Sequence, residues 1–516
     1  MSEVKESTGN SFLGKNIDWP VFGLSGGLVL LFVIGALVDL KLISDWVNAS
    51  FGFACKYLGA YWQILSMVTF LVGLILAFTK YGRVKLGNVA KPEMSTFRWV
   101  AIIMCTLLAG GGVFWSAAEP MYHFTSVPPH FPGVEAGTTA AIAPALSLAF
   151  LHWGFLAWAV LGSTSAIVLM YCHYHKGMAL KPRALLVPLF GEKVMHNWIG
   201  SAADAASIIS VAAGTIGPIG FLGLQVSFAL QHLFGIPDVY MTQLVIIIIL
   251  VAIYTISAVS GLHRGIQLLS RFNVILTLIL MAIILLFGPG LFIIDAFMSG
   301  FSTYIREFPV LAFYRGNLGW LSWWTVFFFG WFIGYGPMMA VFIARISKGR
   351  SIREIIMVVS LIAPVVTNFW FSVLGGSGIY YELQNAGSVS KALSANGLPA
   401  ALLAIVEQMP MAAIMVPAFL ILIVLFLATT GDSMALTISM AVTGDENPST
   451  GIRVFWAIMM GAVAAVLLAV GSGGISALQS FIVVTAIPVG FIILPPIWGG
   501  PKYAAELYEE QKADLT

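Results

Sequence analysis

Residues 323–351, WWTVFFFGWFIGYGPMMAVFIARISKGRS, combine ring-bearing side chains with residues that interrupt helices. A helix that only faces lipid is built mainly from Leu, Ile and Val, so this ring content needs another explanation. Gly334, Gly336 and Pro337 fall in the middle of the stretch, and proline removes a backbone hydrogen bond from a helix. The stretch therefore predicts a membrane-spanning helix that is broken beside a cluster of aromatic rings.

The composition of the whole chain indicates an integral membrane protein. Hydrophobic residues make up 59% of the 516 residues and charged residues 9%, whereas about a quarter of the residues in soluble domains are charged. A crossing helix needs about 20 apolar residues. The stretches that satisfy this length number twelve: 19–39, 57–79, 98–124, 139–171, 198–230, 239–259, 268–297, 322–344, 355–381, 412–440, 452–471 and 475–497.

Lys and Arg are distributed unevenly between the two sides of these spans. If the N-terminus is cytoplasmic, 20 of the 25 Lys and Arg residues fall on the cytoplasmic side. The exceptions are Lys41, Lys56, Arg306, Arg315 and Lys391. Positive charge is retained inside the cell, so we expect a multi-pass protein of the cell (inner) membrane with both termini cytoplasmic. The polar ends are short, and no basic patch indicates a nucleic-acid partner.

Two spans contain helix-interrupting residues. The third span reads LLAGGGVFWSAAEP, with Gly110, Gly111 and Gly112 in a row, and it lies five spans before GWFIGYGP. Interrupted spans at corresponding places indicate a transporter with inverted repeats. The alternative is that these glycines only allow close helix packing.

The resulting fold prediction is an all-α membrane protein with two five-helix repeats, spans 3–7 and 8–12. Its predicted segments are a cytoplasmic N-terminus (1–18), two additional helices (19–95), the first repeat (96–299), an extracellular connection (300–320), the second repeat (321–499) and a cytoplasmic C-terminus (500–516). Residues 385–410 are expected to form a helical extracellular connection.

The aromatic residues beside the interruptions could hold a cation. Trp331 and Tyr335 share a helix face because they are four residues apart, Trp153 and Trp158 lie in the fourth span, and Tyr122 follows Glu119-Pro120. Ring faces attract a cation without N–H donors, such as a trimethylammonium group.

Core packing or an interfacial aromatic belt is the alternative to such a cage. For Trp323 and Trp324 we expect this alternative, a belt or core packing, because they lie at the predicted extracellular edge of the eighth span. His152 is expected to pack or to form hydrogen bonds.

Three motifs together resemble one transporter family. FIARISKGRSIRE (342–354), FWSAAEP (114–120) and HWGFLAWA (152–159) are similar to segments of the betaine/choline/carnitine transporter family, and the resemblance covers nearly the whole chain. It implies the leucine-transporter-type inverted-repeat fold and a homotrimer. It also implies substrates of the glycine betaine, carnitine, choline and dimethylsulfoniopropionate class.

The resemblance also implies a substrate box. Its members by motif are Tyr122, Trp153, Trp331 and Tyr335, with Trp158 on the same span as Trp153. Phe332 and Leu161 stand where the glycine-betaine type of box has a further Trp and Tyr, so the box resembles the carnitine type. Met339 is expected to pack the floor of the site.

The coupling ion is inferred from the same resemblance. Sodium-independent exchangers of the family have an Arg where this chain has Asn273. The hydroxyls and carbonyls that would ligate Na⁺, a hard cation that suits oxygen ligands, come from Cys105, Leu108, Phe426, Thr429 and Thr430. The third span departs from the family pattern, which puts the register of Cys105 and Leu108 in question. Thr429 and Thr430 could also bond only to their own helix.

These observations predict a sodium-coupled secondary transporter without an organic cofactor. The alternative within the family is a sodium-independent exchanger. An enzyme is disfavoured because the eight His residues show no metal-ligand spacing, and a channel or a transport-inactive receptor is the remaining class.

Overall fold

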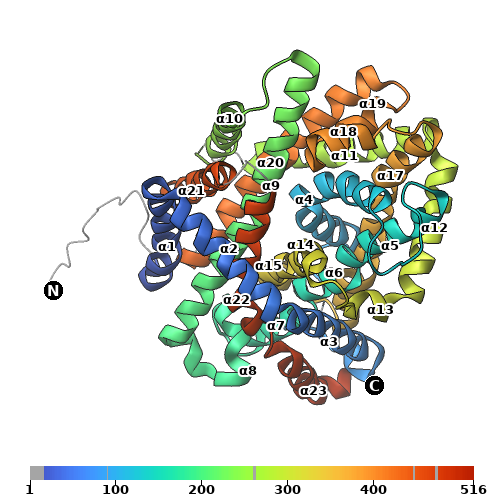
Figure 1. The fold of residues 1–516 in the computed structure, drawn as a ribbon. Coiled ribbons are helices and arrows are strands. Elements are labelled where there is room, and N and C mark those ends of the chain that lie inside the picture. Colours follow the sequence, from blue (N-terminus) through green and yellow to red (C-terminus); the bar gives the residue numbers. More distant parts are fainter. Residues whose placement is uncertain (1–16, 90, 260–262, 445–447, 471–474, 516) are drawn as a thin grey trace.

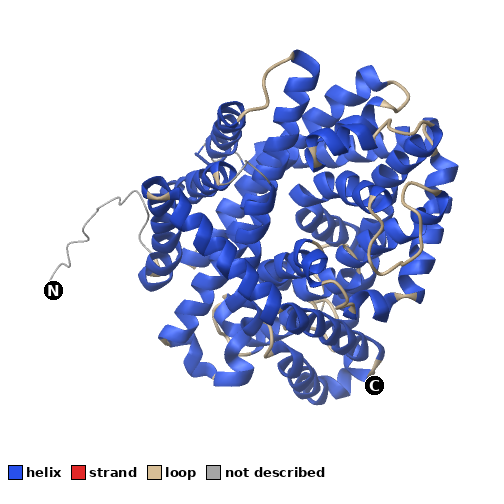
Figure 2. Cartoon of the chain, viewed as in Figure 1, coloured by secondary structure: helices blue, strands red, loops and turns tan. Residues whose placement is uncertain are grey.

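The computed structural model describes residues 17–89, 91–259, 263–444, 448–470 and 475–515, without the side chains of 105–110, 257–258, 263–270 and 513–515. Within these ranges the regular elements are helices (Figures 1 and 2), apart from an isolated β-bridge between Lys85 and Ser351. The prediction of an all-α chain is confirmed.

The long helices correspond to the predicted spans, except for α23, which follows the twelfth span and lies mostly in the predicted C-terminal segment. They are α1 (Trp19–Val38), α3 (Gly59–Phe78), α4 (Thr96–Thr125), α9 (Trp198–Phe234), α10 (Tyr240–Val259), α11 (His263–Phe287), α12 (Gly290–Arg306), α15 (Thr325–Ile346), α17 (Ala363–Gln384), α20 (Ala412–Thr443), α21 (Thr450–Ala469), α22 (Ile475–Ile492) and α23 (Pro496–Leu515).

Shorter helices complete or connect them. They are α2 (Leu40–Tyr57), α5 (Ile142–His152), α6 (Phe155–Gly162), α7 (Thr164–Met170), α8 (Val187–Phe190), α13 (Phe308–Phe313), α14 (Leu318–Trp323), α16 (Ile352–Met357), α18 (Ser390–Asn396) and α19 (Ala401–Glu407). The last two confirm that the 385–410 connection is helical, whereas the helix α2 was not predicted.

Nine helical stretches of the described chain are long and apolar enough to cross a membrane, or ten if α11 and α12 form one bent span. The protein is therefore a multi-pass membrane protein. The span predicted over 268–297 contains a bend that was not predicted: the chain turns by 102° between Phe287 and Gly290, at Gly288 and Pro289. The spans predicted at 98–124 and 239–259 form α4 and α10, and their crossing of the membrane stays a prediction.

The breaks predicted in the third and eighth spans are wrong. The backbone of α4 is helical from Thr96 to Thr125, and α15 continues through Pro337. The glycines of α15 allow close packing instead: a Cβ on Gly334 would lie 2.3 Å from the Ser210 Oγ, and one on Gly336 would lie 2.9 Å from the Val160 carbonyl oxygen. Close helix packing was the alternative for these glycines.

The chain is irregular in the next span of each predicted repeat. Trp153 and Gly154 separate α5 from α6, where a Cβ on Gly154 would lie 2.1 Å from the Phe150 carbonyl oxygen. In the ninth span a π-helical turn, Val358–Ile362, separates α16 from α17. π-Helical turns inside α-helices occur frequently at functional sites.

The helices α4 and α15 lie near the centre of the bundle (Figure 1). The first packs against α5, α9, α17 and α20, and the second packs against α6, α7, α9 and α22. Both helices therefore contact α9, and the site described below lies where the three meet α5.

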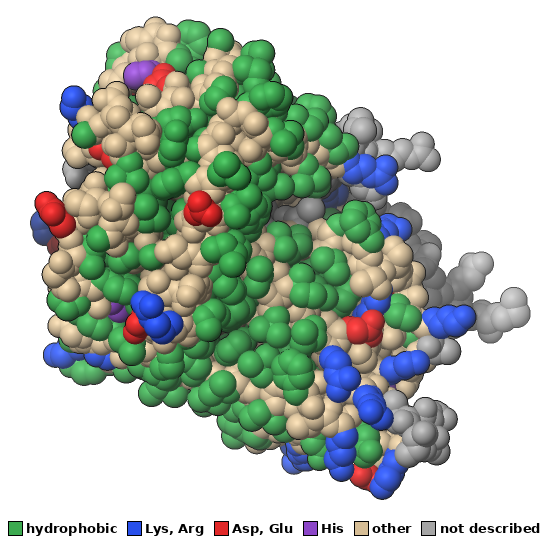
Figure 3. All heavy atoms as spheres, turned by 90° about the vertical axis from the view of Figure 1, so that its right-hand side faces the viewer, with side chains coloured by type: hydrophobic (Ala, Val, Ile, Leu, Met, Phe, Trp, Pro, Cys, Tyr) green, Lys and Arg blue, Asp and Glu red, His purple; other side chains and the backbone are tan. Residues whose placement is uncertain are grey.

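Segments predicted to be cytoplasmic meet at one end of the molecule. Lys85 pairs with Ser351, the Lys85 N–H donates to Gln511 Oε1 at 3.0 Å, and the Gly87 N–H donates to His175 Nε2 at 3.3 Å. The face in Figure 3 has a hydrophobic middle, with Lys and Arg side chains collected towards the lower right. The contacts bring these connections together, and their cytoplasmic location stays a prediction.

Candidate functional site

Two tryptophans from different helices form the centre of the candidate site. Trp153 follows the last residue of α5 and Trp331 lies in α15; their ring centroids are 5.8 Å apart and their planes are nearly perpendicular, at 80°. Phe332 lies edge-on to Trp153 at 5.3 Å, and Phe371 of α17 lies 5.0 Å from the same ring. The structure thus brings together three of the predicted substrate residues, Trp153, Trp331 and Phe332.

Two glycines make room for these rings. A Cβ on Gly111 of α4 would lie 2.6 Å from Trp331 Cη2 and 3.0 Å from Trp153 Cη2. A Cβ on Gly214 of α9 would lie 2.2 Å from the Tyr335 ring. Both distances are shorter than van der Waals contact allows, so α4 and α9 approach the rings only because these positions lack side chains.

The polar atoms of the rings bond to the protein. Trp331 Nε1–H donates to the Gly214 carbonyl at 3.1 Å, and Trp153 Nε1–H donates to Glu119 Oε2 at 3.1 Å. The Tyr335 hydroxyl and the Thr215 hydroxyl form a 2.8 Å hydrogen bond. These bonds satisfy the polar atoms of the rings, which lie in a buried aromatic cluster: Trp153 is 3% and Trp331 6% exposed.

The other predicted substrate residues lie apart from the tryptophan pair. Tyr122 packs against Trp324 at 4.5 Å, and no ring contact in the described part of the chain joins it to Trp153 or Trp331. Trp158 and Met339 are buried. The Trp158 indole nitrogen has no hydrogen-bond partner among the described residues.

The neighbouring residues Trp323 and Trp324 differ in how deeply they are buried. Trp323 is 38% exposed and packs against Phe51 of α2, as an edge residue would. Trp324 is 5% exposed and contacts Tyr122, so it packs in the core. It separates α14 from α15, and that turn directs its ring into the bundle. The spacing of Trp320, Trp324 and Phe328 by four residues was the available sequence signal.

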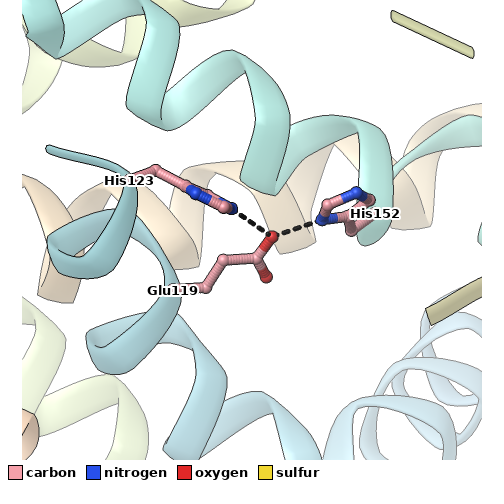
Figure 4. A group of neighbouring side chains, drawn as sticks. All are labelled: Glu119, His123 and His152. Atoms are coloured by element: carbon pink, nitrogen blue, oxygen red, sulfur yellow. Dashed lines mark hydrogen bonds and ion pairs between the residues drawn. The ribbon is translucent and has the colours of Figure 1, made fainter. Parts of the chain in front are cut away.

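A buried polar cluster adjoins Trp153. Glu119 and His123 lie one turn apart in α4, and His152 ends α5; all three are 0% exposed. Figure 4 shows both imidazoles pointing towards one carboxylate oxygen of Glu119. His152 Nδ1 lies 2.5 Å and His123 Nε2 lies 3.5 Å from Glu119 Oε1. His152 therefore forms hydrogen bonds, as predicted.

The predicted sodium ligands lie partly around a second feature, a cavity of about 250 Å³. Asn273 of α11 lines it together with Phe426 and Thr429 of α20. The Thr429 hydroxyl donates to the Leu425 and Phe426 carbonyls of its own helix, which is the common alternative. The buried Thr430 hydroxyl has no hydrogen-bond partner among the described residues.

The side chains of Cys105 and Leu108 lie outside the described residues. Their backbone is part of the helix α4, so the unwound carbonyls that were expected there are not seen. In a helix these carbonyls accept bonds from the following turn.

Comparisons with known proteins decide the family. A model of the betaine/carnitine/choline family transporters matches residues 20–509. The chain is 56% identical to glycine betaine transporter 2 of Vibrio parahaemolyticus, over 95% of this chain and 91% of that protein. The chain belongs to the betaine/carnitine/choline transporter family.

More distant relatives in this family are transporters of related compounds. A probable glycine betaine transporter of Desulfitobacterium hafniense is 32% identical over 92% of this chain and 95% of that protein. An ectoine/hydroxyectoine transporter of Virgibacillus pantothenticus is also 32% identical, over 93% and 95%. Family membership confirms the prediction of a membrane transporter rather than an enzyme.

Proposed function

We propose that the protein imports a glycine-betaine-class zwitterion by sodium-coupled alternating access. The perpendicular pair Trp153 and Trp331 carries this proposal, because both indole N–H groups bond to the protein and only ring faces remain for a ligand. A trimethylammonium or dimethylsulfonium group has no N–H donor, so it loses no hydrogen bond at such a surface. Each cation–π contact contributes about 2 kcal/mol once water is excluded.

The relatives support the substrate class. Two of them are named for glycine betaine and one for ectoine compounds. Phe332, which the motif comparison relates to the carnitine type of box, lies against Trp153 and adds a third aromatic side chain. Glycine betaine is therefore the first candidate, followed by carnitine, choline and dimethylsulfoniopropionate.

The sodium proposal is supported by the cavity beside α4. Asn273 and Thr429 come from helices far apart in sequence, yet they line the same cavity. An amide at position 273 leaves this region without the fixed positive charge that an exchanger would have there. A sodium-independent exchanger remains the alternative function, and uptake without sodium distinguishes the two.

The proposed inverted repeat is supported by where the spans are irregular. The interruption at Trp153 and Gly154 and the π-helical turn Val358–Ile362 both lie in the first half of the second span of a repeat. Those two spans run in opposite directions in the predicted topology, as an inverted pair would. We also propose a homotrimer in the cell (inner) membrane with cytoplasmic termini, on the resemblance and the charge asymmetry.

Ligand binding to the purified protein tests the substrate site. We expect glycine betaine to bind and glycine not to compete, because a buried ammonium donor without a partner costs roughly 1–3 kcal/mol. Trp331→Ala should abolish binding and Trp331→Phe should retain part of it. Trp323→Ala is the matched control, since that ring is half-exposed beside α2. Equal competition by glycine, or unchanged affinity in Trp331→Ala, would contradict the proposal.

A further inference from the structure

The cluster of Glu119, His123 and His152 has the form of a metal site. One oxygen or nitrogen of each residue lies within 4.8 Å of the others, and each side chain is buried. Two imidazoles and a carboxylate are a donor set that zinc uses, with a further position open to water. Because the carboxylate and His123 come from α4 and the other imidazole from α5, the group joins two helices.

The second polar atoms of Glu119 and His152 form hydrogen bonds to neighbouring side chains. Glu119 Oε2 accepts the Trp153 indole N–H at 3.1 Å, and His152 Nε2 lies 2.9 Å from the Thr325 hydroxyl oxygen. Such partners orient metal ligands and fix which nitrogen of a histidine faces the ion. They leave Glu119 Oε1 between His152 Nδ1 and His123 Nε2 (Figure 4).

The two ring nitrogens of His123 lack a hydrogen-bond partner among the described residues. Neither of its nitrogens forms a hydrogen bond within the described residues, and the 3.5 Å separation from Glu119 Oε1 is longer than a normal bond. A buried polar group without a partner costs about 1–3 kcal/mol. A cation bound between His123, Glu119 and His152 would remove this cost.

We propose that Glu119, His123 and His152 bind one divalent transition-metal ion, with Zn²⁺ as the best-fitting candidate. The site is distinct from the proposed sodium region around Asn273, which is built from amide and hydroxyl oxygens. The bound ion ties α4 to the end of α5 and places positive charge beside Trp153. It therefore opposes both movement of these helices and binding of a cationic headgroup, and so it inhibits transport.

Trp320 of α14 lies over the cluster. Its ring centroid is 5.6 Å from that of His123 and 6.4 Å from that of His152, and the residue is only half-buried. Displacement of this half-buried ring would open the cluster towards the surface of the protein. Zn²⁺ should therefore bind faster to Trp320→Ala than to the natural protein.

The test is zinc binding to the tag-free, full-length protein after treatment with a chelator. Isothermal titration and elemental analysis should give one Zn²⁺ per chain. His123→Ala should lower the affinity at least tenfold, and His123→Cys should restore it because a thiolate also ligates zinc. His232→Ala is the matched control, since His232 pairs with Glu407 at the surface and should not affect binding.

Transport provides the second readout and rests on the proposed function, whereas the binding measurement does not. Zn²⁺ should slow uptake of labelled glycine betaine into proteoliposomes containing the natural protein, and His123→Ala should resist this inhibition.

If His123→Ala does not fold, Co²⁺ bound to His123→Cys should show thiolate-to-metal absorption. No bound zinc, zinc retained by His123→Ala, or no cobalt–thiolate absorption would overturn the site. Binding without inhibition would overturn its effect on transport.

Discussion

A single methyl group at residue 111 should disturb the candidate cage. In Gly111→Ala the new Cβ would lie 2.6 Å and 3.0 Å from the Trp331 and Trp153 rings, which are rigid and cannot bend away. Overpacking of this kind costs about 1–3 kcal/mol, and here the displaced groups are the proposed binding surface. We expect substrate affinity to fall at least tenfold in a binding titration, because displaced rings no longer face the same point.

The control for this change is Gly27→Ala in α1. A Cβ on Gly27 meets no atom within 4 Å, and alanine is favoured over glycine in a helix by about 0.5–1 kcal/mol. This variant should bind substrate normally and unfold no earlier. Normal affinity in Gly111→Ala would show that the tryptophan pair does not bind substrate.

Residue-scale predictions from the sequence succeeded where helical spacing alone decides the outcome. Trp331 and Tyr335 both face Gly214 of α9, as the four-residue spacing suggested. Trp324 could not be placed, because its burial depends on how α14 turns into α15 and on the ring of Tyr122. Local sequence does not contain those tertiary contacts.

At the scale of elements, a buried ion pair links α9 to the segment before it, which contains Arg183. Arg183 Nε lies 2.6 Å from Asp204 Oδ2, and the Arg183 backbone N–H donates to Asp204 Oδ1 at 2.7 Å. Asp204→Ala leaves a buried guanidinium without its main partner, which costs about 3–5 kcal/mol. We expect a clearly lower unfolding midpoint in detergent, measured by intrinsic fluorescence.

Asp45→Ala is the matched control for Asp204→Ala. Asp45 pairs with Lys41 at 2.7 Å, but both side chains are exposed, and such surface pairs contribute about 0–1 kcal/mol. Its midpoint should match that of the natural protein. Equal midpoints in the two variants would mean that the Arg183–Asp204 pair does not hold α9 in place.

Asp18 joins the same ion-pair group from the start of α1. Burial alone would raise the pKa of Asp18, but the hydrogen bond and charge of Lys181 and the charge of Arg183 outweigh it and lower that pKa below its usual 3.8. A lowered folded-state pKa stabilises the fold above the unfolded value. The contribution of Asp18 is therefore complete at neutral pH and is lost as the pH falls below about 4.

Element-scale predictions depended on what interrupts a helix. Gly334, Gly336 and Pro337 predicted a break, whereas α15 continues through all three and packs closely against neighbouring groups at its glycines. The interruption at Gly154 occurs where the Phe150 carbonyl and the Tyr304 hydroxyl approach too closely for a side chain. Close packing beside glycine occurs in both places, so the glycines in the sequence did not distinguish the continuous helix α15 from the break at Gly154.

At the scale of the whole molecule, span length and charge were predictable because both are additive along the chain. The connections containing Lys85, His175 and Gln511 contact one another, and the cytoplasmic side that the Lys and Arg count assigns to them stays a prediction. The 102° turn between α11 and α12 was missed, because the apolar run 268–297 continues across it. Hydropathy measures how apolar a segment is and contains no information on its direction.

The proposed coupling predicts that uptake requires sodium and responds to membrane voltage. A zwitterion carries no net charge, so a cotransported Na⁺ makes each cycle electrogenic. An inward potential then contributes about 2.3 kcal/mol per charge per 100 mV. Uptake into proteoliposomes should stop when sodium is replaced by potassium, and it should rise with an inside-negative potential.

Substitutions at Thr430 and Asn273 test which residues bind the sodium ion. The buried Thr430 hydroxyl forms no hydrogen bond within the described chain, so Thr430→Val removes an available oxygen while keeping a similar volume. That variant should need at least tenfold more sodium for half-maximal uptake, whereas Thr437→Val should not, because the Thr437 hydroxyl bonds to Ser433 of its own helix. Asn273→Arg should reduce the sodium requirement, since a fixed guanidinium in this cavity would supply the positive charge that Na⁺ otherwise brings. Full uptake by the natural protein without sodium, indifferent to voltage, would instead identify an exchanger.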